Sequence, residues 1–379
     1  MIIIKAAFWF FLITIVYTFI VYPIVLLLAS FIFRKSRQKS PFYPTVTLVI
    51  SAYNEELHIR DKLKNTLDLK YPKEKLEIIV ASDGSNDHTD DIVRDFQTSG
   101  IKLLRIEGRV GKTEIQNRAV GMASGDILIF SDAESLYDKD SLLHITSNFS
   151  DQRVGAVAGK CVYVKMNSND KMTLATQLYW KFETQLKMWE SEIGTVTGAS
   201  GLIYAIRKSL YLNLPPEIIS DLVTPLLVLR SGNLVVYEPK AIAYEKTSGK
   251  FKKEMQMRSR VILRGMNGLK YVSDLLNPIN HPWISFQLFS HKIVRWITPI
   301  SLIGIIICSM FLIFTRPYTD LLLFSLAFIV ICISFFKSKK TYIIDVLMSV
   351  FASACASAIS IYRFFKGTKI VVWDTDREK

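Results

Sequence analysis

Residues 6–33 form a run of 28 residues without a charged side chain. As a helix rising about 1.5 Å per residue, this run exceeds a hydrocarbon core of roughly 30 Å. A signal peptide has a shorter apolar stretch and a small-residue cleavage site, so we expect residues 1–34 to hold a retained transmembrane helix. Only Lys5 precedes the run, whereas RKSRQK follows it at 34–39, which predicts that the chain after residue 34 is cytoplasmic.

Composition agrees with a membrane protein that also carries a globular domain. The chain has 379 residues, 50% of them hydrophobic, and a formal net charge of +13. Such a charge suits nucleic acid or anionic lipid. Because basic clusters flank the apolar runs, at 34–39 and 337–340, we expect contact with membrane lipids and no nucleic-acid partner. The four cysteines have no spacing typical of a zinc site or a disulfide framework.

The C-terminal third is expected to return the chain to the membrane. Residues 250–295 mix basic and aromatic side chains, which predicts amphipathic helices at the cytoplasmic interface. Residues 296–365 contain apolar runs at 296–315, 321–336 and 346–362, which predict three transmembrane helices before a tail at 366–379. We therefore expect a multi-pass protein of the cell membrane. The basic tail favours the cytoplasmic side, whereas three crossings would place it outside, so its side stays open.

Residues 45–249 form the expected cytoplasmic domain. Strands are predicted at 45–51, 76–82, 101–106, 126–131 and 154–164, a small-residue turn and a strand at 194–204, and one strand or a pair of strands at 234–245. Helical patterns fall between most of them. They lie at 55–69, after the second strand to about residue 96, and at 111–123 and 171–190, and a loop followed by a helix lies at 215–230. This alternation predicts an α/β fold with a doubly wound, parallel sheet.

Acidic residues follow several of these strands. Glu55 comes after the first strand, Asp83 after the second, and Asp132 and Glu134 after the fourth. Parallel strands bring their carboxyl ends to one edge of the sheet, where α/β folds bind ligands, so these side chains are expected to share a cleft. At a strand end, the carboxylates of Asp132 and Glu134 could converge on a hard divalent cation, which could hold a diphosphate.

Basic residues precede the helix at 111–123. Arg109 and Lys112 lie in GRVGK, just before the helix N-terminus, a position that suits anionic phosphates. The segment is not a P-loop, because Ile106 stands where that motif requires glycine.

The ensemble resembles family 2 inverting glycosyltransferases of the GT-A fold, in particular the membrane-embedded branch with the hyaluronan, cellulose and poly-N-acetylglucosamine synthases. The matching residues are SAYNEE at 51–56, SDGSNDHT at 82–89, RVGK at 109–112 with Asn117, SDAES at 131–135, TGASGLIYAIRK at 197–208 and SDLVTP at 220–225. The resemblance implies a GT-A nucleotide-sugar-binding, doubly wound sheet with flanking transmembrane helices.

The resemblance also implies a role for individual residues. Asp83 would hold the base or ribose of a nucleotide sugar, in a pocket lined by Ala52, Tyr53 and Glu55. Asp132 and Glu134 would hold Mg²⁺ or Mn²⁺ on the diphosphate, with help from Arg109 and Lys112. Asp221 would be the general base.

This chain departs from the family pattern at four places. Ser51 replaces a frequent proline, Glu134 replaces aspartate in the metal motif, and Ser220 precedes Asp221 where a second acid is common. The Gln-x-x-Arg-Trp motif of processive members is reduced to its arginine at 257–261, so Arg258 or Arg260 could still meet the diphosphate. The missing tryptophan favours addition of a single sugar.

The expected function is metal-dependent, inverting transfer of a sugar, with a UDP sugar as the expected donor, to a glycan or lipid-linked acceptor at the cytoplasmic membrane face. Two alternatives remain open. One is a processive polysaccharide synthase, and the other is a membrane protein that binds nucleotide sugars without turnover.

Overall fold

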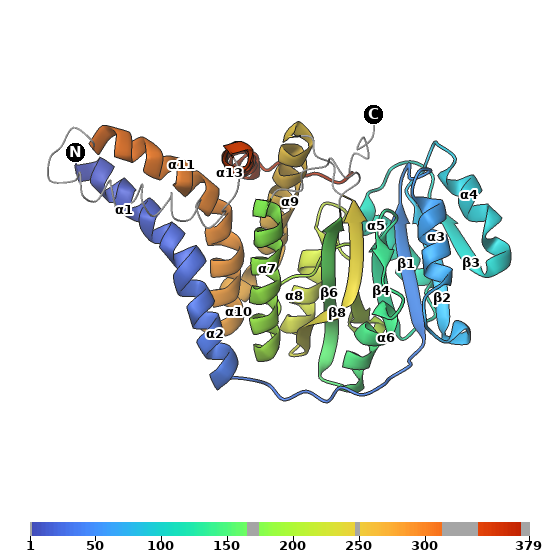
Figure 1. The fold of residues 1–379 in the computed structure, drawn as a ribbon. Coiled ribbons are helices and arrows are strands. Elements are labelled where there is room, and N and C mark those ends of the chain that lie inside the picture. The colour runs from blue at the N-terminus through green and yellow to red at the C-terminus, as the bar shows by residue number, and fades with distance from the viewer. Residues whose placement is uncertain (1, 165–173, 247–250, 313–339, 373–379) are drawn as a thin grey trace.

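The computed structural model describes residues 2–164, 174–246, 251–312 and 340–372. A sheet domain lies beside a group of long helices formed by both ends of the chain (Figure 1). Within the described part, two helical stretches are long and apolar enough to cross a membrane, Ile2–Ile32 and Pro282–Leu312. The expected span at 321–336 lies outside the described residues.

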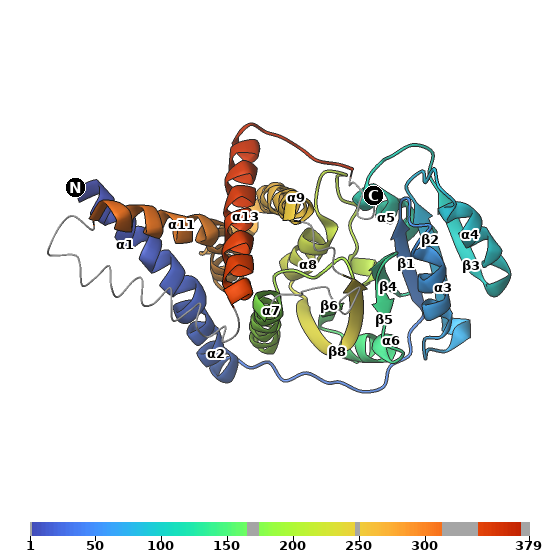
Figure 2. The same cartoon turned by 45° about the horizontal axis from the view of Figure 1, so that its top comes forward.

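The first stretch consists of α1 (Ile2–Val16), a π-helical turn and α2 (Tyr22–Ile32). The second consists of α10 (Pro282–Gln287), another π-helical turn and α11 (Val294–Leu312), so the expected boundary between residues 295 and 296 falls inside a helix. α11 packs along α1 and also contacts α13 (Lys340–Phe365) (Figure 2).

The sheet has eight strands in the order β3-β2-β1-β4-β7-β6-β8-β5. Their bounds are β1 Val46–Ala52, β2 Leu76–Ser82, β3 Ile101–Arg105, β4 Ile127–Asp132, β5 Leu136–Tyr137, β6 Val154–Val164, β7 Tyr204–Arg207 and β8 Leu234–Lys246. Strands β3, β2, β1 and β4 are parallel, as expected.

The other half of the sheet is mixed, so the prediction of a parallel sheet is confirmed for β3, β2, β1 and β4 but not for this half. β7 runs antiparallel to both β4 and β6, and β5 runs antiparallel to β8. Tyr204 at the start of β7 pairs with Phe130 near the end of β4. The chain thus re-enters the sheet at the carboxyl edge of β4 and must run back along it, which brings the loop at 194–203 to that edge.

Helices cover both faces of the sheet. The domain helices are α3 Ile59–Leu67, α4 Thr89–Asp95, α5 Lys112–Met122, α6 Ser141–Thr146, α7 Leu174–Ile193 and α8 Ser220–Arg230. Side chains of α3, α4 and α6 pack in one apolar cluster with Leu48 and Ile50 of β1. Side chains of α5 and α8 pack in the other with Val49, and this cluster continues to Leu288 and Trp296 of the second apolar stretch. One core therefore joins the sheet domain to a candidate membrane helix.

Helix α9 (Phe251–Tyr271) lies between α8 and α11, and two of its glycines permit close packing. A methyl group built at Gly265 would lie 2.9 Å from a ring carbon of Trp296. A methyl group built at Gly268 would lie 2.8 Å from a methyl carbon of Val223. Larger side chains at either position would separate α8 from its neighbours.

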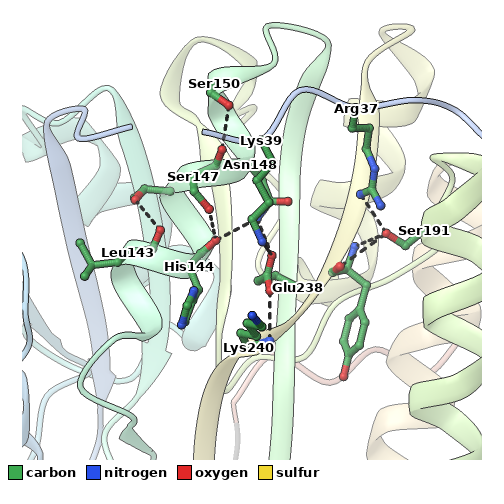
Figure 3. A network of polar contacts seen from close by, with 12 residues as sticks. Arg37, Lys39, Leu143, His144, Ser147, Asn148, Ser150, Ser191, Glu238 and Lys240 are labelled. Carbon is green, nitrogen blue, oxygen red and sulfur yellow. Dashed lines mark hydrogen bonds and ion pairs between the residues drawn. The ribbon is translucent and has the colours of Figure 1, made fainter. Parts of the chain in front are cut away.

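The segment between α2 and β1 is tied to the sheet domain by polar contacts (Figure 3). Lys39 forms an ion pair with Glu238, which also accepts a hydrogen bond from Asn148 Nδ2 at 2.9 Å. Arg37 donates to Ser191 Oγ at 3.1 Å. This connection therefore packs along the surface of the sheet domain.

Candidate active site

The parallel strands end level with one another at the carboxyl edge of the sheet. Ala52 pairs with Ser82 of β2, and Ser51 pairs with Asp132 of β4. The acidic residues that follow these strands therefore start from the same edge.

Lys112, Asp132 and Asp221 meet around Gly201, in the loop that leads into β7. The Gly201 N–H donates to Asp221 Oδ2 at 2.9 Å. A methyl group built at Gly201 would lie 2.7 Å from Lys112 Nζ, 3.3 Å from Asp221 Oδ2 and 3.4 Å from Asp132 Oδ2. Lys112 also forms an ion pair with Asp132. Three segments that are far apart in the sequence thus place two carboxylates and one ammonium group against Gly201. Because glycine has no side chain, the three groups fit there.

Asp83 is fully buried and faces the loop before α5. Its carboxylate accepts hydrogen bonds from the backbone N–H of Val110 at 2.7 Å and of Gly111 at 3.1 Å. Gly111 has a φ of +92°, a region that favours glycine. Burial raises the pKa of Asp83, and the two amides oppose that shift. Asp83 therefore shapes the loop that carries Arg109 and Lys112.

Arg109 stacks on Tyr53, with its guanidinium carbon 3.7 Å from the ring centroid. Tyr53 directly follows Ala52, the buried last residue of β1. The pair therefore places a planar cation and an aromatic ring at the expected nucleotide pocket.

Glu55 lies close to the two acids of the expected metal motif. Its carboxylate is 3.0 Å from His58 Nδ1. Burial raises the pKa of Glu55, and the charges of Glu134 and Asp132 raise it further. The three carboxylates therefore share one electrostatic environment, which a cation would relieve.

The donor set at this edge fits a hard divalent cation that arrives with its ligand. The described residues contain no group of three His, Cys, Asp or Glu side chains placed to hold a metal. Mg²⁺ commonly uses one or two carboxylates together with substrate phosphates, so a complete protein cage is not required. Asp132 and Glu134 would supply the carboxylates. Before a cation binds, the ammonium group of Lys112 balances the charge of Asp132.

The arginines of α9 differ in their contacts. Arg258 donates to Ser353 Oγ of α13, and Arg260, which is partly buried, lies half a turn further along α9. The arginine that reaches the site loops is Arg264, which is 6% exposed and donates to Ile218 O at 2.8 Å and Thr113 Oγ1 at 3.0 Å. Sequence reasoning missed it, although its position beside Gly265 in a close-packing helix is a usable signal.

Lys62 was also missed. It is fully buried in α3, and its Nζ donates to the carbonyl oxygen of Ser135 at 2.6 Å, just after the Asp-Ala-Glu motif. The signal was its place on the apolar face of α3, three residues after Ile59 and next to Leu63.

The chain after α13 reaches the same edge. Figure 2 shows this segment running back from α13 to α5. Lys369 Nζ lies 2.6 Å from Glu217 Oε1, and a methyl group built at Gly111 would lie 2.5 Å from Val371 O. No part of the tail was assigned a role from sequence.

Comparisons with known proteins agree with this geometry. The family described as glycosyl transferase family 2 matches residues 47–210. A probable glycosyltransferase, YdaM of Bacillus subtilis, is 29% identical over 60% of this chain and 56% of its own length. A poly-β-1,6-N-acetyl-D-glucosamine synthase of Staphylococcus aureus is 27% identical over 52% of this chain and 49% of its own length. The chain thus spans about half the length of these curated relatives.

The fold is also shared with a solved enzyme. A mannosyltransferase, PcManGT of Pyrobaculum calidifontis, whose structure was solved with GDP-Man and Mn²⁺, superposes with a TM-score of 0.72 at 20% identity, over 94% of this chain and 98% of that one. This likeness establishes the GT-A fold. Residues 47–210 therefore form a domain of glycosyl transferase family 2.

Proposed function

We propose that this protein is a membrane-anchored, metal-dependent, inverting glycosyltransferase that moves one sugar from a nucleotide sugar to a glycan or lipid-linked acceptor at the cytoplasmic membrane face. The observation that carries the proposal is the convergence of Lys112, Asp132 and Asp221 around Gly201. Inverting transfer is a single displacement, which needs a base for the acceptor hydroxyl and charge stabilisation for the leaving diphosphate.

Asp221 has the features of the general base. The Gly201 amide holds Oδ2 at 2.9 Å, while Oδ1 accepts no hydrogen bond within the part of the chain that the structure describes. Oδ1 can therefore accept the proton of an acceptor hydroxyl. Asp221 lies in the first turn of α8, where the helix dipole favours the ionised carboxylate that a base requires.

The leaving diphosphate would lie on the other side of Gly201. Lys112, in the first turn of α5, supplies a positive charge there, and Arg109 stacked on Tyr53 supplies another beside the nucleotide. A Mg²⁺ or Mn²⁺ ion held by Asp132 and Glu134 would add Lewis-acid stabilisation of the leaving group. Asp83 orders the loop that carries both cations.

The relatives support the donor class. The solved mannosyltransferase was crystallised with a nucleotide sugar and Mn²⁺, and the name of the staphylococcal relative is that of an N-acetylglucosamine polymerase. We propose a UDP sugar as the first donor to test. The relative's name favours a processive synthase as the second candidate, whereas the missing tryptophan after Arg260 favours single addition.

The test is release of nucleoside diphosphate by purified protein in nanodiscs, with a panel of nucleotide sugars, Mn²⁺ or Mg²⁺, and membrane lipid extract as acceptor. Turnover of one donor is expected, and Asp221→Asn should lower it by roughly 10²- to 10⁴-fold while donor binding persists. Product length, read by mass spectrometry, separates single addition from polymerisation. Donor binding without turnover for the whole panel would instead identify a protein that binds nucleotide sugars without reacting them.

A further inference from the structure

Lys292 lies in the π-helical turn just before α11 and faces the loop at 197–201. A methyl group built at Gly198 would lie 3.4 Å from Lys292 Nζ and 3.2 Å from Leu222 Cδ1. Leu222 directly follows Asp221. The ammonium group of a candidate membrane helix therefore contacts the loop that positions the proposed general base.

The same loop separates two cations. Lys112 lies at Gly201, toward the proposed donor diphosphate, and Lys292 lies at Gly198. Asp221 is held between them, because the Ala199 N–H donates to its backbone oxygen at 2.9 Å and the Gly201 N–H donates to its carboxylate. In an inverting displacement the acceptor approaches from the face opposite the leaving group, so the side of Lys292 is the side from which an acceptor would come.

The carboxylates near Lys292 are engaged by other groups. Glu190 Oε1 accepts a hydrogen bond from Tyr22 at 2.9 Å and lies 2.5 Å from His291 Nδ1. Glu183 forms an ion pair with Arg295 and lies 3.2 Å from His291 Nε2. Although burial raises it, the charges of Arg295 and His291 hold the pKa of Glu183 well below its usual range.

Lys292 itself makes no hydrogen bond or ion pair with any described residue, and it is only partly exposed. The charges that act on it are those of Glu183, Glu190, Lys187 and Arg295, so the permanent cations of the cluster, Lys292 included, outnumber the carboxylates. A charge in such a place is costly unless an anion pairs with it.

A hydroxyl group in the same loop also lacks a partner. Thr197 directly precedes Gly198, is 1% exposed, and its Oγ1 has no hydrogen-bond partner among the described residues. An unpaired ammonium group beside Gly198 and an unpaired hydroxyl group on the residue before Gly198 are donors that suit an anionic oxygen.

We propose that Lys292, assisted by Thr197, binds the phosphate group of a lipid-linked acceptor, so that the attached sugar reaches Asp221. This inference rests on the proposed function and names its acceptor class. Gly201 is three positions after Gly198 in the sequence, which limits the distance between their Cα atoms to about 10 Å. A sugar joined to a phosphate at Lys292 can therefore present a hydroxyl group to Asp221, while the lipid chain stays beside α11.

The test measures binding of a lipid phosphate without turnover. Full-length protein in phosphatidylcholine nanodiscs is titrated with hexadecyl phosphate or with hexadecanol, and binding is read by native mass spectrometry. The wild-type protein should bind hexadecyl phosphate more tightly than hexadecanol. Lys292→Met should reduce that preference by roughly 10- to 100-fold, the range for one lost hydrogen bond to a charged group, whereas Lys292→Arg should keep it. Lys270→Met, which removes an exposed lysine of α9, should keep it as well.

Thermal unfolding distinguishes a binding role from a structural one. Removing an unpaired, partly buried charge should leave the unfolding midpoint of Lys292→Met equal to or above that of wild type. A lower midpoint with unchanged lipid preference would overturn the proposal and make Lys292 a counter-charge for Glu183 and Glu190. Displacement of hexadecyl phosphate by inorganic phosphate at equal concentration would also overturn it, since the site would then bind free anions.

Failure of the inference can be separated from failure of the proposed function. If turnover of a nucleotide sugar depends on Asp221 but lipid binding does not depend on Lys292, the inference is contradicted and the proposed function is not. If lipid binding depends on Lys292 but no donor is turned over, the proposed function is contradicted and the lipid-binding role of Lys292 is not.

Discussion

Lys62 Nζ donates to the carbonyl oxygen of Ser135 from a fully buried position, at 2.6 Å, and lies 3.8 Å from the ring centroid of Tyr137. It thus ties α3 to the turn that presents Asp132. Burial lowers the pKa of Lys62 to about 7, against the opposing charge of Asp132. This residue links the stability of the metal motif to pH.

The first prediction concerns this linkage. Because the pKa of Lys62 is lower in the folded chain than in the unfolded chain, the unfolded chain binds more protons between pH 7 and the usual lysine range. The stability of wild type relative to Lys62→Met should therefore rise from pH 7 to pH 9, by at most about 1.4 kcal/mol per pH unit. Thermal unfolding midpoints of both proteins in nanodiscs check this. Lys64→Met, exposed on the same helix, should show no such trend, and a flat difference for Lys62→Met would contradict the expected pKa.

The second prediction concerns the space at Gly201. Gly201→Ala places a methyl group 2.7 Å from Lys112 Nζ, so the lysine must move away from its place between Asp132 and Asp221. We expect transfer to fall by roughly tenfold or more, because displaced catalytic groups lose their productive geometry, while the protein still folds. Steady-state assays and unfolding midpoints measure the two effects. Gly121→Ala, in α5 with open space around it, is the matched control and should keep full activity.

The third prediction concerns the metal. Asp132→Asn removes one of the two proposed carboxylate ligands, so the Mn²⁺ concentration for half-maximal activity should rise by roughly tenfold or more. Chelation with EDTA should abolish wild-type turnover, and added Mn²⁺ should restore it. Asp95→Asn, which alters an exposed carboxylate on α4, should leave the Mn²⁺ titration unchanged. An Asp132→Asn enzyme with a wild-type titration curve would exclude Asp132 as a ligand.

The fourth prediction concerns Arg264. Arg264→Met removes the buried, charged donor that Ile218 O and Thr113 Oγ1 share and leaves them only their hydrogen bond to each other, which should cost about 1–3 kcal/mol and lower the unfolding midpoint. Because Thr113 follows Lys112, the KM for the donor should rise as well. Arg230→Met breaks only a surface ion pair with Asp274 and should change neither quantity. A stable Arg264→Met protein with unchanged donor KM would show that α9 does not position this loop.

Much of the fold was predictable because local patterns determine it. The strands at 76–82 and 154–164 were predicted with the bounds that the structure has, since each is a mostly apolar segment that contains several Val or Ile residues. In the stretch at 194–204, predicted as a turn and a strand, only Tyr204 lies in β7, which continues to Arg207. The earlier part of this stretch is a loop whose path depends on contacts with Asp221 and Lys292, which are distant in the sequence, so local pattern could not locate it.

The site was predictable to the extent that strand ends define it. The common edge of Glu55, Asp83 and Asp132 follows from parallel pairing alone. The burial of Lys62 and Arg264 does not, because each is held by backbone carbonyl oxygens of other segments, and a carbonyl leaves no mark in the sequence. Sequence reasoning selected Arg258 and Arg260 by motif register, whereas packing brings Arg264 to the loops.

The apolar core that runs from Val49 through α8 to Leu288 and Trp296 has a consequence for how this protein can be produced. A shortened chain that ends at residue 249 would expose the surfaces of Leu222 and Val223 that α9 and Trp296 cover. We expect such a fragment to aggregate rather than behave as an independent folding unit. The glycosyltransferase domain and the candidate membrane helices should instead melt together in one cooperative transition, so that a detergent that loosens the helices also inactivates the site.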